Sequence, residues 1–185
     1  PSPSWSEADA DMQKAWAQAT QALAKNSDHC QDQALVQDFG ELVQLQKDVM
    51  SYEMARSLSF ERLRHREALS PALQALLDTG MAISGAQHAA NLQRTADWRL
   101  RIDALFERHD VLLTPSTTGA APEGLAATGD PLFCRSWSLL GLPAVHLPLM
   151  RNAKGLPVGL QLVGRMGEDH KLLAAASHIH DKLRF

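Results

Sequence analysis

Residues 132–148 read LFCRSWSLLGLPAVHLP, and they lead from an irregular loop through a Gly-Leu-Pro turn into an apolar strand over residues 144–150. A second stretch, residues 157–164, reads PVGLQLVG and predicts another strand over residues 158–163. A short apolar run at residues 111–114 has the composition of a buried strand. These three short strands give the chain a strand-rich part from about residue 110 to residue 185.

Helical periodicity dominates the chain before residue 110. The pattern predicts a helix over residues 7–25, another over 38–66, a short one over 71–79 and a long one over 84–109. The pair Leu35-Val36 fits either a brief edge strand or a lead-in to a helix. After the strands, a last helix begins near residue 169. The expected fold class is therefore α/β, with several helices (about 6–109) followed by a short mixed sheet and a final helix.

Sequence signals mark several helix ends. Ser6 is expected to cap the first helix, and Ser70 followed by Pro71 marks the start of the short one. Gly80 is expected just beyond the end of that helix, where glycine is favoured. Ser84 with Gln87 forms a capping box that opens the long helix.

Composition narrows the functional classes. The net charge of −3 leaves no electrostatic footprint for nucleic acid, and no apolar run is long enough to span a bilayer. The two cysteines lie far apart in sequence and are expected to be reduced thiols, which makes a cytoplasmic location the default. No pattern for a cofactor or a metal ion is found, because the glycines do not follow the dinucleotide fingerprint.

The two opening stretches, in this order and spacing, resemble the C-terminal end of the amidase signature family, serine amidohydrolases with a Ser-Ser-Lys triad. The resemblance covers residues 37–180 and is strongest from 110 to 175. It implies a parent enzyme that hydrolyses carbon–nitrogen amide bonds through a serine acyl-enzyme. We expect residues 1–185 to be a C-terminal fragment of one such domain, which completes its sheet and part of its substrate pocket.

The chain departs from the family in two ways. Many members have Thr where Cys134 stands and Asn where Ser138 stands. The Gly/Ser-rich loop and the lysine that the chemistry needs are also absent. Ser84-Gly85 is the pair most similar to that loop, but it is interpreted as a helix start. Lys154 and Lys171 have no matching serine motif. No catalytic residue is therefore expected in this chain, and the fragment is predicted to be inactive alone.

By resemblance, the loop around residue 135 faces the substrate. Trp137 would wall the pocket and Arg135 would orient a carboxylate or carbonyl, with Ser138 beside them. The alternatives are that Trp137 belongs to the core and that Arg135 forms a surface ion pair. Thr114 and Pro115 are further candidates, because α/β sites gather at the carboxyl ends of strands.

Other reactive side chains have simpler interpretations. Cys134 is expected to be a buried, inert thiol, since nothing near it in sequence would activate it. His146 is expected to be a hydrogen-bonded core histidine. His178 and His180 lie two residues apart on a predicted helix and so point to different faces, which argues against a shared metal ion.

Two further functions stay open. One is a non-catalytic interaction module, with homo-oligomerisation through exposed apolar surface. The other is the tail of a transamidating subunit similar to glutamyl-tRNA amidotransferase. In the leading case, the partner is a small-molecule amide bound by the full-length enzyme.

Overall fold

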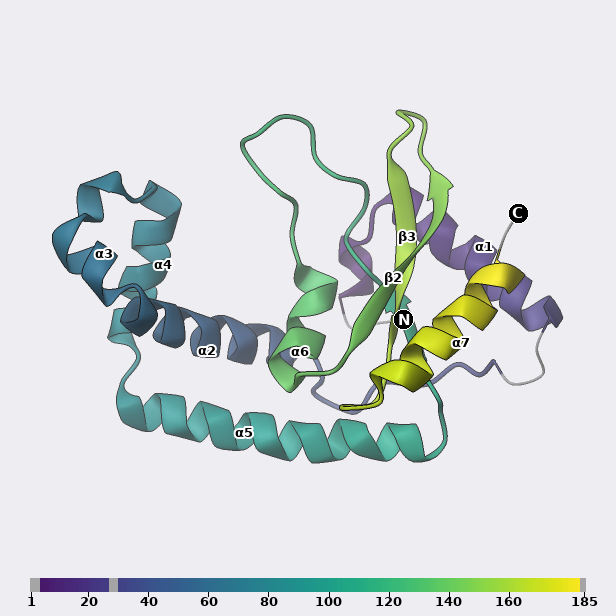
Figure 1. Ribbon diagram of the computed structural model, residues 1–185, viewed down its shortest axis with the longest axis horizontal. Coiled ribbons are helices and arrows are strands. Elements are labelled where there is room, and N and C mark those ends of the chain that lie inside the picture. Colours follow the sequence, from purple (N-terminus) through teal and green to yellow (C-terminus); the bar gives the residue numbers. More distant parts are fainter. Residues whose placement is uncertain (1–3, 27–29, 184–185) are drawn as a thin grey trace.

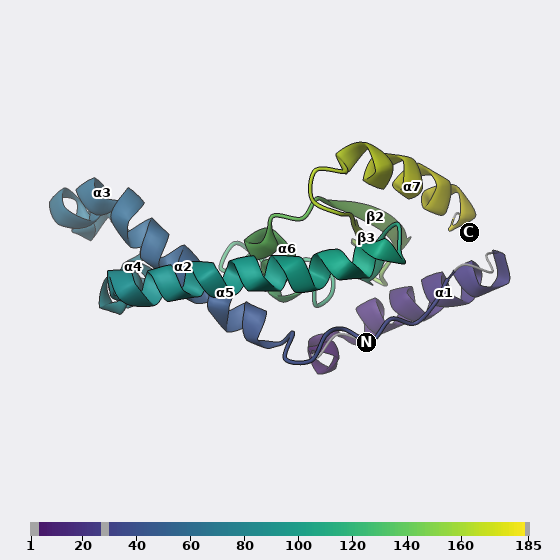
Figure 2. The same cartoon turned by 90° about the horizontal axis from the view of Figure 1, so that it is seen from below.

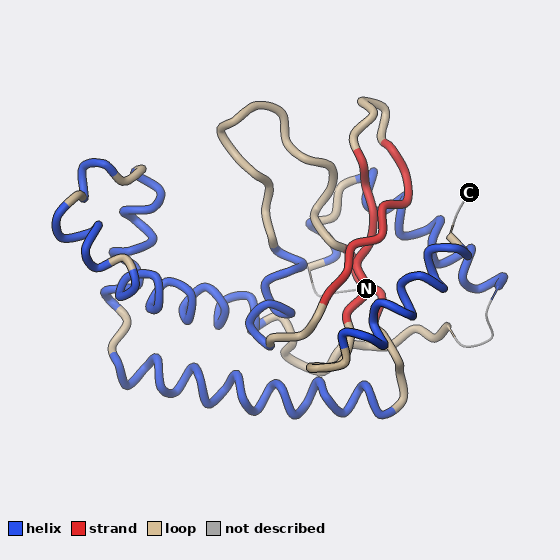
Figure 3. The backbone as a smooth tube through the Cα atoms, in the orientation of Figure 1, coloured by secondary structure: helices blue, strands red, loops and turns tan. Residues whose placement is uncertain are grey.

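The computed structural model describes residues 4–26 and 30–183. It contains a sheet of three strands. The strands are β1 (Leu112–Pro115), β2 (Ala144–Arg151) and β3 (Pro157–Val163). Of these, β2 and β3 stand between α6 (Leu132–Leu140) and α7 (Asp169–Lys182) (Figure 1). Figure 3 shows the strands in red among the helices. The order of the strands is β1-β3-β2, and both pairs are antiparallel. The described residues therefore contain no parallel pair of the kind that the expected mixed sheet would include.

Seven α-helices lie within the described residues (Figure 1). Their bounds are α1 (Ala10–Asn26), α2 (Glu41–Ser57), α3 (Ser59–Arg64), α4 (Pro71–Ala82), α5 (Gly85–Asp103), α6 (Leu132–Leu140) and α7 (Asp169–Lys182). Short 3₁₀ turns occupy Trp5–Glu7, Arg66–Ala68 and Ala104–Glu107. None of the helices in the part of the chain that the structure describes is both long enough and apolar enough to cross a membrane.

Two hydrophobic clusters use opposite sides of β3. Leu160 and Leu162 belong to a cluster that α1 and α7 complete, and these two helices lie along one face of the sheet (Figures 1 and 2). Val163 belongs to a second cluster with side chains of α2, α5 and α6. This assignment follows from the alternation of side chains along a strand, and it makes β3 the element shared by both cores.

Helices α3 and α4 form an arm that extends away from the sheet (Figure 1). Its connection to α2 is a close helix crossing: a Cβ on Gly80 would overlap the carbonyl group of Ser51 and approach the Cβ of Ala55. Gly80 therefore lies inside α4, which continues to Ala82. The predicted role of Gly80 beyond the helix end is wrong, because the glycine serves close packing.

Several predicted boundaries also shift. The helix expected over 38–66 ends at Ser57, and the chain resumes as the short α3. Leu35 and Val36 form neither strand nor helix, but they pack against the second cluster. The segment between α1 and Leu35 lies partly outside the described residues, which omit 27–29.

The helix starts were predicted with mixed success. The Ser84 and Gln87 capping box is present, and the Ser70 hydroxyl accepts a hydrogen bond from the Leu73 N–H. The expected cap at Ser6 is wrong. Asp9 takes this role, since its carboxylate accepts a hydrogen bond of 2.8 Å from the Met12 N–H.

Candidate functional site

Helix α6 occupies the first half of the stretch 132–148. Its buried residues are Phe133, Ser136, Trp137 and Leu140, which share one helical face. Gly141 ends the helix in the left-handed conformation with φ of 72°, a backbone state that glycine adopts at no steric cost. The sequence predicted an irregular loop before the Gly-Leu-Pro turn, so this nine-residue helix was missed.

A buried glutamine ties α6 to the sheet. The Gln161 amide donates to the carbonyl oxygens of Pro115 (2.9 Å) and Phe133 (3.0 Å). Beside it, the Ser116 hydroxyl donates to the Gly159 carbonyl at 2.8 Å. This network fixes the end of β1 against the start of α6. Sequence reasoning missed Gln161, although a polar residue within an otherwise apolar strand was a usable signal.

Cys134 completes this network. Its thiol donates to the Ser116 carbonyl at 3.0 Å and lies 3.7 Å from the Gln161 side-chain oxygen. Burial raises the pKa of the Cys134 thiol, and the contact with Gln161 only partly opposes this. The thiol is therefore protonated at neutral pH, which agrees with the expectation of an inert cysteine.

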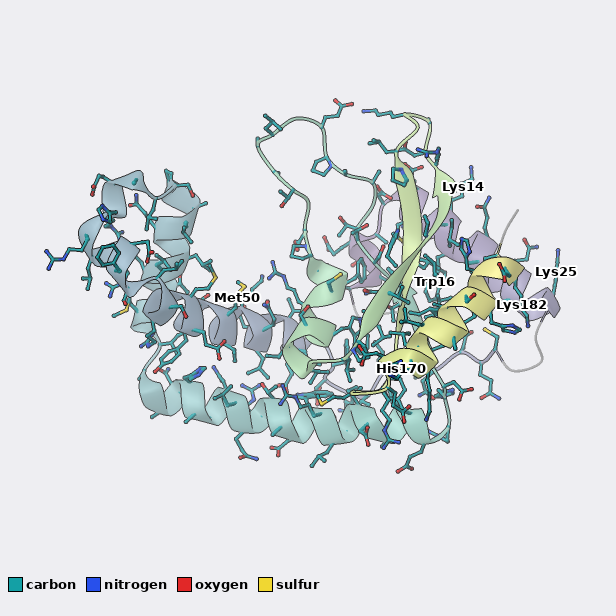
Figure 4. All side chains as sticks on the ribbon, viewed as in Figure 1. Lys14, Trp16, Lys25, Met50, His170 and Lys182 are labelled. Carbon is teal, nitrogen blue, oxygen red and sulfur yellow. The ribbon has the colours of Figure 1, made fainter. Side chains whose placement is uncertain are left out.

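The predicted substrate-binding residues separate into three places. Thr114, Pro115 and Trp137 line one hollow of about 620 Å³ beside β1. Ser138 is exposed and lines a second hollow, of about 860 Å³, between α2, α5 and α6. Figure 4 labels Trp16, which lines the first hollow, and Met50, which lines the second.

Trp137 is also a core residue. It is 4% exposed, and its ring lies 5.2 Å from that of Phe39. The alternative of a core tryptophan is thus supported by the packing, while contact with a substrate stays a prediction.

Arg135 lies on neither hollow's lining. Its Nη1 donates to the Gln46 side-chain oxygen at 2.9 Å, and its Nη2 lies 3.6 Å from the Asp130 carboxylate. The expected surface ion pair is therefore long, and the side chain is only 17% exposed.

The histidines are placed differently from one another. His146 is exposed on β2 with its ring over Gly159, so the predicted core position is wrong. Partial burial lowers the pKa of His146 below its usual value. His178 is exposed on α7, and the described residues contain no group of three His, Cys, Asp or Glu side chains arranged to hold a metal ion.

The described elements thus form a helix-covered antiparallel sheet, in which β3 is joined to the start of α6 through Gln161. The family model for amidases matches residues 2–173. The chain therefore belongs to the amidase family.

Solved structures agree with this assignment. An amidase crystal structure is 25% identical, with a TM-score of 0.82 over 96% of this chain and 43% of that one. A bacterial aryl acylamidase of the amidase signature family is 18% identical, with a TM-score of 0.71 over 96% of this chain and 41% of that one. The described helices and strands thus correspond to less than half of each of these chains.

Similar curated proteins are A subunits of glutamyl-tRNA(Gln) amidotransferase. The mitochondrial subunit of Rattus norvegicus is 38% identical over 85 residues, which is 41% of this chain and 16% of the relative. The subunit of Pelagibacter ubique is 33% identical over 90 residues, or 45% of this chain and 19% of the relative. The matched region spans about a fifth or less of either relative.

Proposed function

We propose that this chain is the C-terminal segment of an enzyme that hydrolyses carbon–nitrogen amide bonds through a serine acyl-enzyme. The segment supplies part of the sheet and one wall of the substrate pocket. The Ser-Ser-Lys groups that perform the chemistry come from polypeptide outside these 185 residues. The substrate is a small-molecule amide.

The observation that carries this proposal is the hollow beside β1. Within the described residues β1 pairs only with β3, so its other edge is open. The hollow is lined by Trp16 and Leu23 of α1, Ile179 of α7 and Trp137 of α6. Helices on both faces of the sheet thus border an open strand edge, which favours a further layer of the same domain at this position.

The test is an amidase assay of the chain alone and of the chain joined to the polypeptide that carries the Ser-Ser-Lys residues. Simple aliphatic and aryl amides serve as substrates. We expect turnover only in the joined protein, because proton transfer to and from a serine needs the lysine nearby.

A matched control replaces the nucleophilic serine of the joined protein by alanine and should abolish turnover without loss of folding. If the isolated chain hydrolyses amides at the rate of the joined protein, the placement of the catalytic groups outside it is wrong. If neither does, the proposed activity itself fails.

A second candidate is the tail of a transamidating subunit. It is favoured by the A subunits of glutamyl-tRNA(Gln) amidotransferase, which are 33–39% identical over the matched regions. The joined protein would then release ammonia from glutamine and pass it to an acceptor only with partner subunits present. Glutamine-dependent amide transfer that exceeds hydrolysis of simple amides would select this candidate over the first.

A further inference from the structure

The Arg135 guanidinium is a charged group with too few partners. It carries five N–H donors in a fixed plane. Among the described residues, Nη1 donates a hydrogen bond to the neutral side chain of Gln46, while Nε is buried and has no partner there. A largely desolvated cation without a close counter-ion is unfavourable, so such a group calls for an explanation.

The atoms that lack partners lie on one edge of the guanidinium. Gln46 occupies Nη1, whereas Nε and Nη2 form the side-on edge that matches the two oxygens of a carboxylate. Asp130 approaches this edge but stays 3.6 Å from Nη2, and its side chain is 59% exposed. Asp130 therefore interacts only weakly with this edge, and the carboxylate of a ligand can displace it.

The surroundings also favour an anion. Arg135 lies in the first half of α6, and its contact with Asp130 places the guanidinium beside the start of that helix. The first turn of α6 contains no acidic residue, and no side chain caps its N–H groups. The positive end of the helix thus adds to the charge of Arg135.

We propose that Arg135 binds the carboxylate of the substrate, and that the enzyme acts on amides that carry an acid group. The N–H groups of the Nε–Nη2 edge donate hydrogen bonds to the two carboxylate oxygens. Gln46 holds the guanidinium in place from the other side, and the Asp130 side chain moves away from the edge. The identification of the bound acid as a substrate rests on the proposed amidase function. The carboxylate site itself can be measured without catalysis.

The first experiment titrates the 185-residue chain with succinamate and with succinamide, which differ in one acid group. Binding is followed by calorimetry and by the Nε–Hε resonances of arginine in NMR spectra. We expect succinamate to bind about tenfold or more tightly than succinamide, the size expected for a pair of charge-assisted hydrogen bonds. The Arg135 Nε–Hε resonance should shift with succinamate only.

Four variants separate a binding site from a structural contact. Arg135→Gln should remove the preference for succinamate, and Arg135→Lys should restore only part of it, since lysine cannot bind in a bidentate way. Asp130→Asn should tighten succinamate binding severalfold, because it removes the competing carboxylate. Arg64→Gln makes the same charge change on the distant arm and should have no effect.

If Arg135 has only a structural role, these variants should give the opposite results. Arg135→Gln would then lower stability while succinamate and succinamide bind alike, and Asp130→Asn would weaken the fold without improving binding. Either result overturns the proposal.

The second experiment uses the joined enzyme and distinguishes the two proposals. Arg135→Gln should raise KM for succinamate about tenfold or more and raise KM for succinamide much less, because only succinamate carries the acid group that Arg135 binds. Succinamate binding without hydrolysis of any amide refutes the amidase function but keeps the carboxylate site. Hydrolysis of both amides with an unaltered KM in Arg135→Gln refutes the carboxylate site alone.

Discussion

The two cysteines of the chain differ in environment. Cys30 is exposed, whereas the Cys134 thiol donates to the Ser116 carbonyl and has a pKa raised by burial. Because the thiolate is the reactive form, we expect iodoacetamide to alkylate Cys30 at least about tenfold faster than Cys134 at pH 7.5. Mass spectrometry of a labelling time course measures both rates.

The variant Gln161→Leu is the matched control for this experiment. It removes the amide that links the strand end to α6 and should speed the labelling of Cys134 without changing that of Cys30. Equal rates for the two cysteines in the unaltered chain would contradict the assigned environments.

His146 gives the chain a defined response to acid. Its ring lies over Gly159, and partial burial lowers its pKa below the usual value near 6.5. Between these two pKa values the unfolded chain binds more protons than the folded chain, so the free energy of unfolding falls as the pH is lowered. The His146→Gln variant should lose this component.

Urea denaturation at pH 7.5 and pH 5.5 measures this effect. The unaltered chain is expected to lose more stability between the two pH values than His146→Gln does. His178→Gln, an exposed histidine on α7, is the control and should behave as the unaltered chain does. A smaller loss in the unaltered chain than in His146→Gln would reverse the sign and contradict the assignment.

At the scale of elements, the crossing of α2 and α4 depends on the absence of a side chain at Gly80. A methyl group there would overlap the Ser51 carbonyl, which is backbone and cannot rotate away. Gly80→Ala is therefore expected to destabilise the chain by about 1–3 kcal/mol, the usual cost of overpacking. Chemical denaturation measures the change.

Gly85 provides the matched control. It opens α5, and a Cβ there would meet only the Tyr52 hydroxyl, at an ordinary contact distance of 3.7 Å. Gly85→Ala should change stability by no more than about 0.5–1 kcal/mol, and in the favourable direction. Equal effects of the two substitutions would show that α2 and α4 do not pack closely at Gly80.

The elements differ in how far sequence predicts them. Capping at Ser70 and Ser84 was predictable, because both signals are local and the side chains act on their own helix. Gly80 was not, because its role depends on Ser51 in another helix. Helix α6 was missed although its apolar residues have helical spacing. The stretch was interpreted as irregular because it adjoins a Gly-rich loop.

The candidate site shows the same division. Thr114, Pro115 and Trp137 line one hollow. Thr114 and Pro115 were candidates because they end a strand, whereas Trp137 was a candidate only through the family resemblance. The partners of Arg135 were not predictable, because Gln46 lies 89 positions away in sequence and meets it only through packing of α2 on α6. Gln161 likewise joins a strand end and a helix start that are distant along the chain.

At the scale of the whole molecule, the open edge of β1 and the apolar hollow beside it favour self-association. We expect the isolated chain to form dimers or larger species as its concentration rises, measured by light scattering. Leu113→Lys places a charge on this edge strand and should lower the average mass. Leu125→Lys, on the exposed loop, should not.

A chain that stays monomeric at every concentration would contradict this prediction. A reduction of mass by both lysine variants would show that association does not involve β1. When the chain is joined to the polypeptide that carries the catalytic groups, association through this edge should disappear, since the same edge would then be covered.

The central place of β3 has a consequence for synthesis. Both other strands pair with β3, and α1 packs on it, yet β3 follows all three in the sequence. During synthesis, the apolar sides of α1, β1 and β2 that pack on β3 stay uncovered by it until residues 157–163 emerge. We therefore expect the nascent polypeptide to expose these apolar surfaces during that interval, which is when chaperone binding is most favoured.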